Sequence, residues 1–303
     1  MPNQLEADSL RSILSGVKRP SRYVGGEWGT FSGQKSKDPL QVCYAFPDLY
    51  EVGMSYLGYQ ILYSLTKTFD YVNVERVYSP WADLEESLRN SGIPLWSLEN
   101  KRPLSHFDVL AFTLQYELSY TNILTILDLG EIPIRSSQRS DSDPIVIAGG
   151  PCALAPEPLA PFIDAFCIGD GEIFLPKIYG TLKALKGSTR SEKLSALSKI
   201  EGVYVPEFNG GKKVRKQILE DLDNSFFPTE MIVPNTGIIH DRIAVQVFRG
   251  CTRGCRFCQA GMIDRPIRER SADSVVNQVE ELLKTTGWEE VGLLSLATCD
   301  WSN

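Results

Sequence analysis

Five short apolar runs, separated by helical patterns, most constrain what this chain can fold into. The runs lie at residues 41–46, 72–78, 108–114, 144–149 and 165–169. Apolar residues recur at helical spacing over residues 55–67, 80–91 and 119–130. Near-continuous apolar strands separated by helices are typical of a parallel sheet covered on both faces. The predicted fold class is therefore α/β, with a doubly wound parallel sheet. Ser79 and Pro80 are the expected N-cap and first residue of the second helix.

Two of the predicted strands end in glycine-rich turns. Gly149, Gly150 and Pro151 follow the fourth strand, and Gly169 and Gly171 follow the fifth. Ligands of doubly wound sheets bind beyond the carboxyl ends of the strands, and glycine lets backbone approach a ligand closely. These five residues are candidate ligand contacts. The alternative is that they form tight turns that need positive φ.

The chain becomes more polar and irregular over residues 186–240. Residues 186–193 have the composition of a loop. The sequence Asn209-Gly210-Gly211 predicts a hairpin turn between strands at residues 202–208 and 214–219.

A third pattern begins near residue 241. It predicts a strand at 243–248, a helix capped by Ser271 and ended by Gly287, and a strand at 291–296. One such unit cannot bury both faces of its sheet, so we expect it to dock on the first unit or to belong to a longer protein. The expected organisation is an N-terminal helical segment (1–39), an α/β domain (40–186), a connector with a hairpin (187–240), and the start of a further core (241–303).

Composition excludes some classes of function. The chain has 303 residues and a net charge of −7, which argues against a broadly basic coat for nucleic acid. No apolar run approaches the roughly 20 residues needed to cross a bilayer, and no signal peptide is evident. A cytoplasmic protein without a membrane partner is expected.

Three of the seven cysteines, Cys251, Cys255 and Cys258, lie within eight residues. Thiolates suit zinc and iron–sulfur clusters. Structural zinc needs four ligands, and His240 or Cys299 is a candidate fourth. Four cysteines would close a 4Fe–4S cluster into an electron carrier, whereas three leave one iron open for chemistry.

The Cys-x3-Cys-x2-Cys spacing, in the loop after a strand and with Phe257 before the last cysteine, resembles that of the radical S-adenosylmethionine (SAM) superfamily. The resemblance implies that Cys251, Cys255 and Cys258 hold a 4Fe–4S cluster whose open iron chelates SAM. It implies that Phe257 lies near the adenine. Thr298 and Asp300, after the second strand, lie at the position of the superfamily motif that contacts the SAM amino group. The resemblance therefore makes them candidate SAM contacts. A flavodoxin or ferredoxin is the implied reductant.

The N-terminal part resembles the Rossmann-like cobalamin-binding domains that precede some radical SAM cores. The stretches PDLYEVGMSYLGYQILY, HDRIAVQ and RGCTRGCRFCQAGM resemble an uncharacterised bacterial branch of that group, whose core continues well beyond residue 303. The resemblance makes Gly149, Gly150, Pro151, Gly169 and Gly171 candidate contacts of cobalamin. The chain lacks Asp-x-His-x-x-Gly, and Cys152 stands where relatives often have histidine. Cobalamin is therefore a candidate cofactor that binds without an axial histidine, and the alternative is that this domain has lost it.

The function expected from this resemblance is that of a radical SAM enzyme or of its N-terminal portion. Residues 241–303 would form the first β-α-β part of its partial TIM-type barrel. Methyl or related group transfer is the candidate chemistry. RNA is one candidate substrate. The alternatives are a closed-site iron–sulfur electron carrier and a zinc-stabilised binding module. Six arginines between residues 249 and 270 predict either an anion site or a salt-bridged surface. Cys43 and Cys167 are expected to be buried apolar residues.

Overall fold

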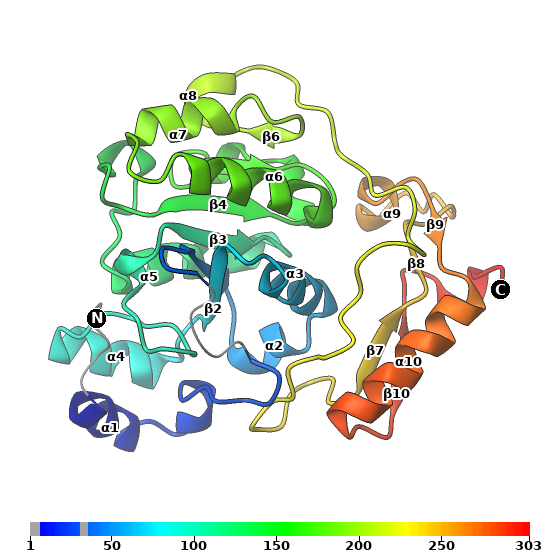
Figure 1. The fold of residues 1–303 in the computed structure, drawn as a ribbon, viewed down its shortest axis with the longest axis horizontal. Helices are drawn as coiled ribbons and strands as arrows, with labels where there is room; N and C mark the ends of the chain where they lie inside the picture. Colours follow the sequence, from blue (N-terminus) through cyan, green and yellow to red (C-terminus); the bar gives the residue numbers. More distant parts are fainter. Residues whose placement is uncertain (1–6, 31–35) are drawn as a thin grey trace.

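A six-stranded sheet forms the centre of the N-terminal part of the chain (Figure 1). The computed structural model describes residues 7–30 and 36–303. The strand order is β2-β1-β3-β4-β5-β6. The strands are β1 (Leu40–Phe46), β2 (Val72–Tyr78), β3 (Val109–Thr113), β4 (Ile145–Gly149), β5 (Ala165–Cys167) and β6 (Val203–Tyr204). The first five pair in parallel, which confirms the predicted sheet, and β6 adds an antiparallel edge.

Helices cover both faces of this sheet, as the apolar strands require. One face packs against α1 (Ala7–Ser15), α4 (Ala82–Ser91) and α5 (Tyr120–Leu129). The other packs against α2 (Tyr50–Met54), α3 (Leu57–Lys67), α6 (Gly171–Ala184) and α7 (Arg190–Leu197). Cys43 lies in the first core and Cys167 in the second, both buried as expected. Short 3₁₀ helices occupy Pro20–Arg22, Leu104–His106, Glu117–Ser119, Ser136–Gln138, Pro151–Leu154, Glu157–Leu159 and Thr298–Asp300.

The predicted start of α4 was wrong. The helix begins at Ala82, with Trp81 in the N-cap position. Ser79 instead donates its backbone N–H to the carbonyls of Phe46 and Asp48. This shared hydrogen bond keeps the backbone at residue 79 extended beyond β2, so the helix begins only after Pro80.

The hairpin predicted in the connector was also wrong. Pro206 opens the short helix α8 (Pro206–Asn209), where its fixed φ suits a first helical position. Gln217 pairs in parallel with Gly169, so the second predicted strand contacts the end of β5 instead. The loop predicted at residues 186–193 contains the start of α7, where Thr189 and Glu192 form a capping box.

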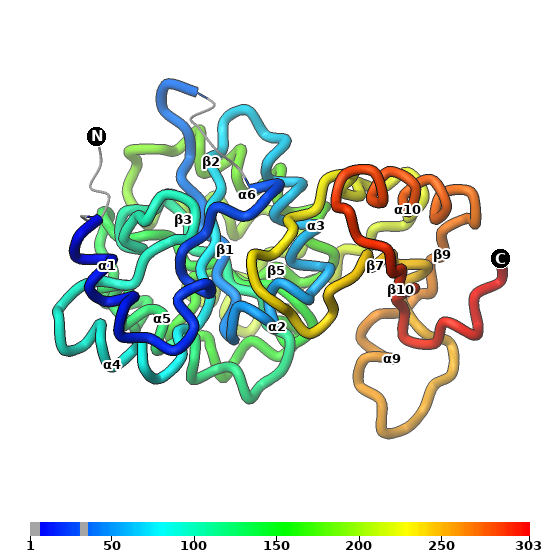
Figure 2. Tube along the Cα trace, turned by 90° about the horizontal axis from the view of Figure 1, so that it is seen from below, coloured from blue at the N-terminus to red at the C-terminus, as the bar shows by residue number. Residues whose placement is uncertain are grey.

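The C-terminal unit is small and lies to one side of the larger sheet (Figure 2). It contains β7 (Ile243–Gln246), β8 (Phe248–Arg249), α9 (Ala260–Ile263), β9 (Arg268–Glu269), α10 (Ala272–Thr286) and β10 (Val291–Leu294). Strands β7 and β10 pair in parallel on either side of α10 in the sequence, which is the predicted β-α-β unit. Ser271 accepts the N–H of Ser274, and Gly287 has φ +74°, so both predicted helix ends are confirmed.

The C-terminal unit docks on the larger one through α3. Leu57 and Ile61 of this helix belong to the same buried cluster as Ile243, Val245 and Val247. Docking is therefore hydrophobic, as expected for a sheet that is too small to bury its own faces. Strand β10 stays largely exposed: Leu293 and Leu294, which point to opposite faces, are each 46% accessible.

Within the described residues, no helix has both the length and the apolar composition that crossing a membrane requires.

Candidate functional site

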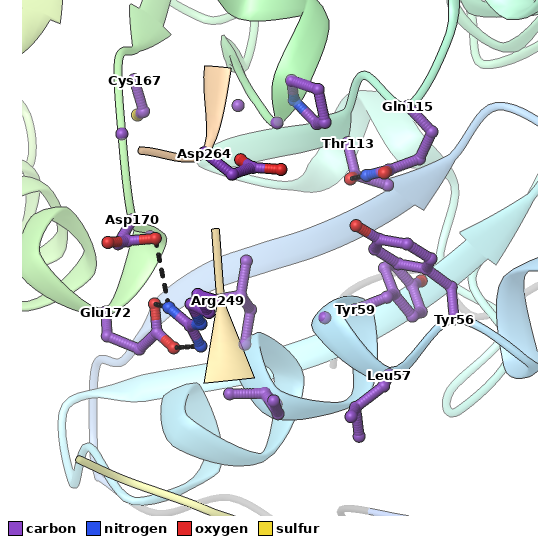
Figure 3. A pocket seen from close by; sticks show the side chains of 18 of the residues that line it. Tyr56, Leu57, Tyr59, Thr113, Gln115, Cys167, Asp170, Glu172, Arg249 and Asp264 are labelled. Carbon is purple, nitrogen blue, oxygen red and sulfur yellow. Dashed lines mark hydrogen bonds and ion pairs between the residues drawn. The ribbon is translucent and has the colours of Figure 1, made fainter. Parts of the chain in front are cut away.

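A cavity of about 380 Å³ lies where the two units meet, within the usual size of small-molecule sites. One wall consists of residues 56–59 at the start of α3 and the carboxyl ends of β3, β4 and β5. The opposite wall consists of Gln246, Phe248–Arg249, residues 263–264 and residues 294–296. Figure 3 shows these walls converging on one space. The position at the carboxyl ends of parallel strands is where doubly wound sheets bind ligands.

All five glycine-turn residues line this cavity, namely Gly149, Gly150, Pro151, Gly169 and Gly171. The structure also gives a packing reason for two of them. Gly150 has φ +110°, and a Cβ there would lie 2.7 Å from the carbonyl oxygen of Leu114. Gly169 has φ +133°, and a Cβ would overlap the backbone of Gln217. These turns are therefore required by the protein's own backbone as well as being placed at the cavity.

An ion-pair network joins the two units beside the cavity. The guanidinium of Arg249 donates to Glu172 at 2.5 Å and to Asp170 at 3.2 Å (Figure 3). Arg268 donates to the other oxygen of Asp170 at 2.6 Å. This network could not be predicted from the sequence, because its acids and arginines are about 80 to 100 residues apart and carry no spacing signal.

The rest of the cavity wall is mostly apolar and aromatic. Burial raises the pKa of the Cys167 thiol to about 12 and that of the Tyr56 hydroxyl to about 12, so both keep their protons at neutral pH. Neither His106 nor His240 is among the described residues that line the cavity. His240 lies in a smaller neighbouring pocket, where its backbone N–H donates to Ser55.

The cysteine loop follows β8 on the C-terminal unit. Cys251 and Cys258 are partly buried, Cys255 is exposed, and all three are free thiols. The N–H of Arg253 donates to the sulfur of Cys251 at 3.5 Å, and that of Gly261 to the sulfur of Cys258 at 3.4 Å. A Cβ on Gly261 would lie 3.6 Å from the Cys258 sulfur, which is an ordinary van der Waals distance, so packing in this loop does not require a glycine there.

The donor set fits an iron–sulfur cluster by its chemistry, since it offers three free thiols and backbone donors to two of the sulfurs. The loop is not closed around a ligand set, however. In the part of the chain that the structure describes, no three His, Cys, Asp or Glu side chains are grouped closely enough to hold a metal ion. Assignment of Cys251, Cys255 and Cys258 as cluster ligands stays a prediction.

The residues after β10 lie close to the cysteine loop. Asp300 accepts a hydrogen bond from Nε of Arg253 at 2.6 Å, which joins the two strand ends. Thr298 bonds the hydroxyl of Ser295 at 2.8 Å. Phe257 is 91% accessible, and Cys299 is exposed. The SAM contacts of Phe257, Thr298 and Asp300 stay a prediction, and the bond to Arg253 brings Asp300 to the loop that contains Phe257.

Most of the arginines between residues 249 and 270 bind the protein itself. Arg253 pairs with Asp300, and Arg249 and Arg268 belong to the network above. Arg270 is fully buried and donates to the carbonyl of Leu222; burial lowers its pKa to about 10. Arg253, Arg256 and Arg265 are the exposed members of the six, and Arg253 is paired with Asp300. The side chains of Arg256 and Arg265 have no hydrogen bond or ion pair within residues 7–30 and 36–303. The salt-bridged alternative accounts for most of the cluster.

Comparison with known proteins finds similarity to one protein family and to individual relatives. The family described as radical SAM proteins, N-terminal, matches residues 58–206, which include strands β2 to β6 but not β1. The uncharacterized protein MJ0966 of Methanocaldococcus jannaschii is 28% identical over 214 residues, 70% of this chain. Residues 58–206 of this chain are therefore similar to the N-terminal part of radical SAM proteins.

Two solved radical SAM enzymes share the fold. One is the cobalamin-dependent enzyme OxsB with aqua-cobalamin and SAM bound, with a TM-score of 0.51 and 15% identity over 86% of this chain. The other is the methyltransferase TsrM of Kitasatospora setae with tryptophan and a SAM analogue bound, with a TM-score of 0.51 and 13% identity over 85% of this chain. The chain spans 44% of the M. jannaschii relative, 34% of OxsB and 48% of TsrM.

Proposed function

We propose that this chain carries the N-terminal domain and the cluster loop of a radical SAM enzyme. The observation that supports this most directly is the three-cysteine loop, which follows β8 and lies beside the end of the parallel strand β10. Cys251, Cys255 and Cys258 would hold a 4Fe–4S cluster and leave one iron open. When bound, such a cluster supplies the electron for cleaving SAM to a 5′-deoxyadenosyl radical.

The chain's own residues would hold and orient these groups. Backbone N–H groups of Arg253 and Gly261 stabilise negative charge on the sulfurs of Cys251 and Cys258. Asp300 fixes Arg253 of the cysteine loop. A flavodoxin or ferredoxin as electron donor and a cytoplasmic location are part of the proposal.

The interdomain cavity is the proposed site of a second cofactor, a corrinoid. Its support is the position at the carboxyl ends of β3 to β5, together with a fold shared with a cobalamin-dependent enzyme. Since no histidine of the described residues lines the cavity, the corrinoid would bind without a histidine from that wall. Methyl or related group transfer is the reaction class that this pairing favours, and the substrate, RNA included, is open.

Anaerobic reconstitution with iron and sulfide tests the cluster assignment. We expect about four irons per chain and an EPR signal of the reduced protein that shifts when SAM is added. Replacing Cys251, Cys255 or Cys258 with Ser should abolish the signal. Cys299→Ser is the matched control and should leave it intact, because that thiol lies outside the loop.

The two alternatives give different results in the same experiment. Loss of the cluster in Cys299→Ser and no response to SAM would indicate a closed electron carrier. A colourless protein with about one zinc and no sulfide would indicate a zinc-stabilised module and overturn the proposal.

A further inference from the structure

Asp264 occupies a special position in the interdomain cavity. It follows the last residue of α9 and caps that helix through its backbone N–H, which donates to Ala260. Its side chain projects from the C-terminal unit into the cavity, whose opposite side includes Thr113 and Gln115 (Figure 3). An occupant of the cavity would therefore meet this carboxylate directly.

The cations that line the cavity all bind other acceptors. Arg249 is held by Asp170 and Glu172. Arg268 donates to Asp170 and to the carbonyls of Pro266, Leu219 and Asp264. Lys216 donates to the carbonyls of Ile263 and Arg265. None is left to receive an anionic group of an occupant without breaking a protein contact.

The acids that line the cavity differ from one another in whether a side chain of the protein pairs with them. Asp170 and Glu172 are neutralised by arginines, whereas the carboxylate of Asp264 has no hydrogen-bond or ion-pair partner among residues 7–30 and 36–303. Burial raises the pKa of Asp264 above that of an ordinary aspartate, despite nearby Lys216 and Arg268. The carboxylate oxygens of Asp264 are still reached by solvent in the empty cavity. An occupant that excludes this water would leave the carboxylate without a donor, which is unfavourable unless an N–H of the occupant bonds it.

We propose that Asp264 selects an occupant whose rim carries hydrogen-bond donors, such as carboxamide N–H groups, over one whose rim carries carboxylates. The inference rests on the proposed corrinoid site and adds a specificity-determining residue to it. A corrin ring with amide side chains supplies such donors. The same ring with free carboxylates would place like charges beside Asp264, which is destabilising.

The test compares two corrinoids that differ in their rims. Cobinamide has the amide-fringed ring without the nucleotide tail, and cobyrinic acid has the same ring with carboxylates. Each is titrated into the protein, with binding followed by the absorbance of the corrin. The wild-type protein should bind cobinamide at least about tenfold more tightly, the ratio expected when a charge-assisted bond is replaced by repulsion.

Three variants complete the design. Asp264→Asn should reduce the preference for cobinamide by about tenfold, mainly by improving the binding of cobyrinic acid. Asp264→Glu keeps the charge and should keep the preference. Asp70→Asn is the matched control, since Asp70 is exposed and lies before β2, at the opposite end of the sheet. The thermal midpoint of each variant reports whether it is folded.

The outcomes separate this inference from the function on which it rests. If both probes bind and their ratio is the same in wild type and Asp264→Asn, the role of Asp264 is wrong and the corrinoid site stands. If neither probe binds the folded wild-type protein, the corrinoid site is wrong and the inference falls with it. If the preference for cobinamide over cobyrinic acid falls in Asp264→Asn but not in Asp264→Glu or Asp70→Asn, the result supports both the corrinoid site and the role of Asp264.

Discussion

At the scale of single residues, Asp264 combines burial with the lack of a partner. The pKa of its carboxyl is raised mainly by burial. Such a group makes the folded protein less stable at neutral pH than a neutral isostere would. Groups of this kind are typical of ligand sites, because the ligand supplies the missing interaction.

The raised pKa of Asp264 has a consequence for the stability of the ligand-free protein. Its folded-state pKa lies above its unfolded value, so the folded state binds this proton more tightly, and stability is lost as pH rises through that interval. Asp264→Asn should therefore raise the thermal midpoint slightly at pH 7. The advantage should vanish below about pH 4, where aspartate is protonated in both states. A midpoint unchanged by the substitution at pH 7 would contradict the argument.

At the scale of elements, α10 is a helix whose two ends can be predicted from its sequence. Ser271 caps the start, and Gly287 takes the left-handed conformation that ends the helix. Ser271→Ala should weaken the helix by about 1 kcal/mol. Amide exchange in the first turns of α10 should then be about fivefold faster, measured by hydrogen–deuterium exchange. Ser271→Asp keeps a capping oxygen and should leave the exchange rates nearly unchanged.

At the scale of the whole molecule, two kinds of contact hold the C-terminal unit. Leu57 and Ile61 of α3 pack into its apolar cluster, and Arg249 binds Asp170 and Glu172. The ion pairs also form part of the cavity wall. The cavity therefore depends on how the two units are held together.

Removing the two acids should loosen this interface. In Asp170→Asn combined with Glu172→Gln, two largely buried guanidinium groups lose their counter-charges. A loss of about 2–4 kcal/mol is expected, somewhat below the range for fully buried pairs. Amide exchange should rise first in residues 243–303 and leave β1 to β4 protected. The control is Asp38→Asn, whose ion pairs with Lys183 and Lys186 are at the surface and should add little. Uniform loss of protection across both units would contradict the interface role.

Much of the fold could be predicted from the sequence because its signals are local. Apolar runs marked β1 to β5, and the caps of α10 were visible as Ser271 and Gly287. The connector was mispredicted because Asn209-Gly210-Gly211 is compatible with a hairpin in isolation. In the tertiary structure, the backbone of Gln217 pairs in parallel with that of Gly169 and does not pair with residues 202–208.

The sequence by itself determined the parallel sheet, the glycine turns at its carboxyl edge and the three-cysteine loop, because periodicity and close spacing are properties of neighbouring residues. Only the tertiary structure decided that Arg249 binds Asp170, 79 residues away, and that Asp264 faces a cavity without a partner. Pairings of this kind depend on how separate elements pack, and no local spacing encodes which charges a fold will bring together.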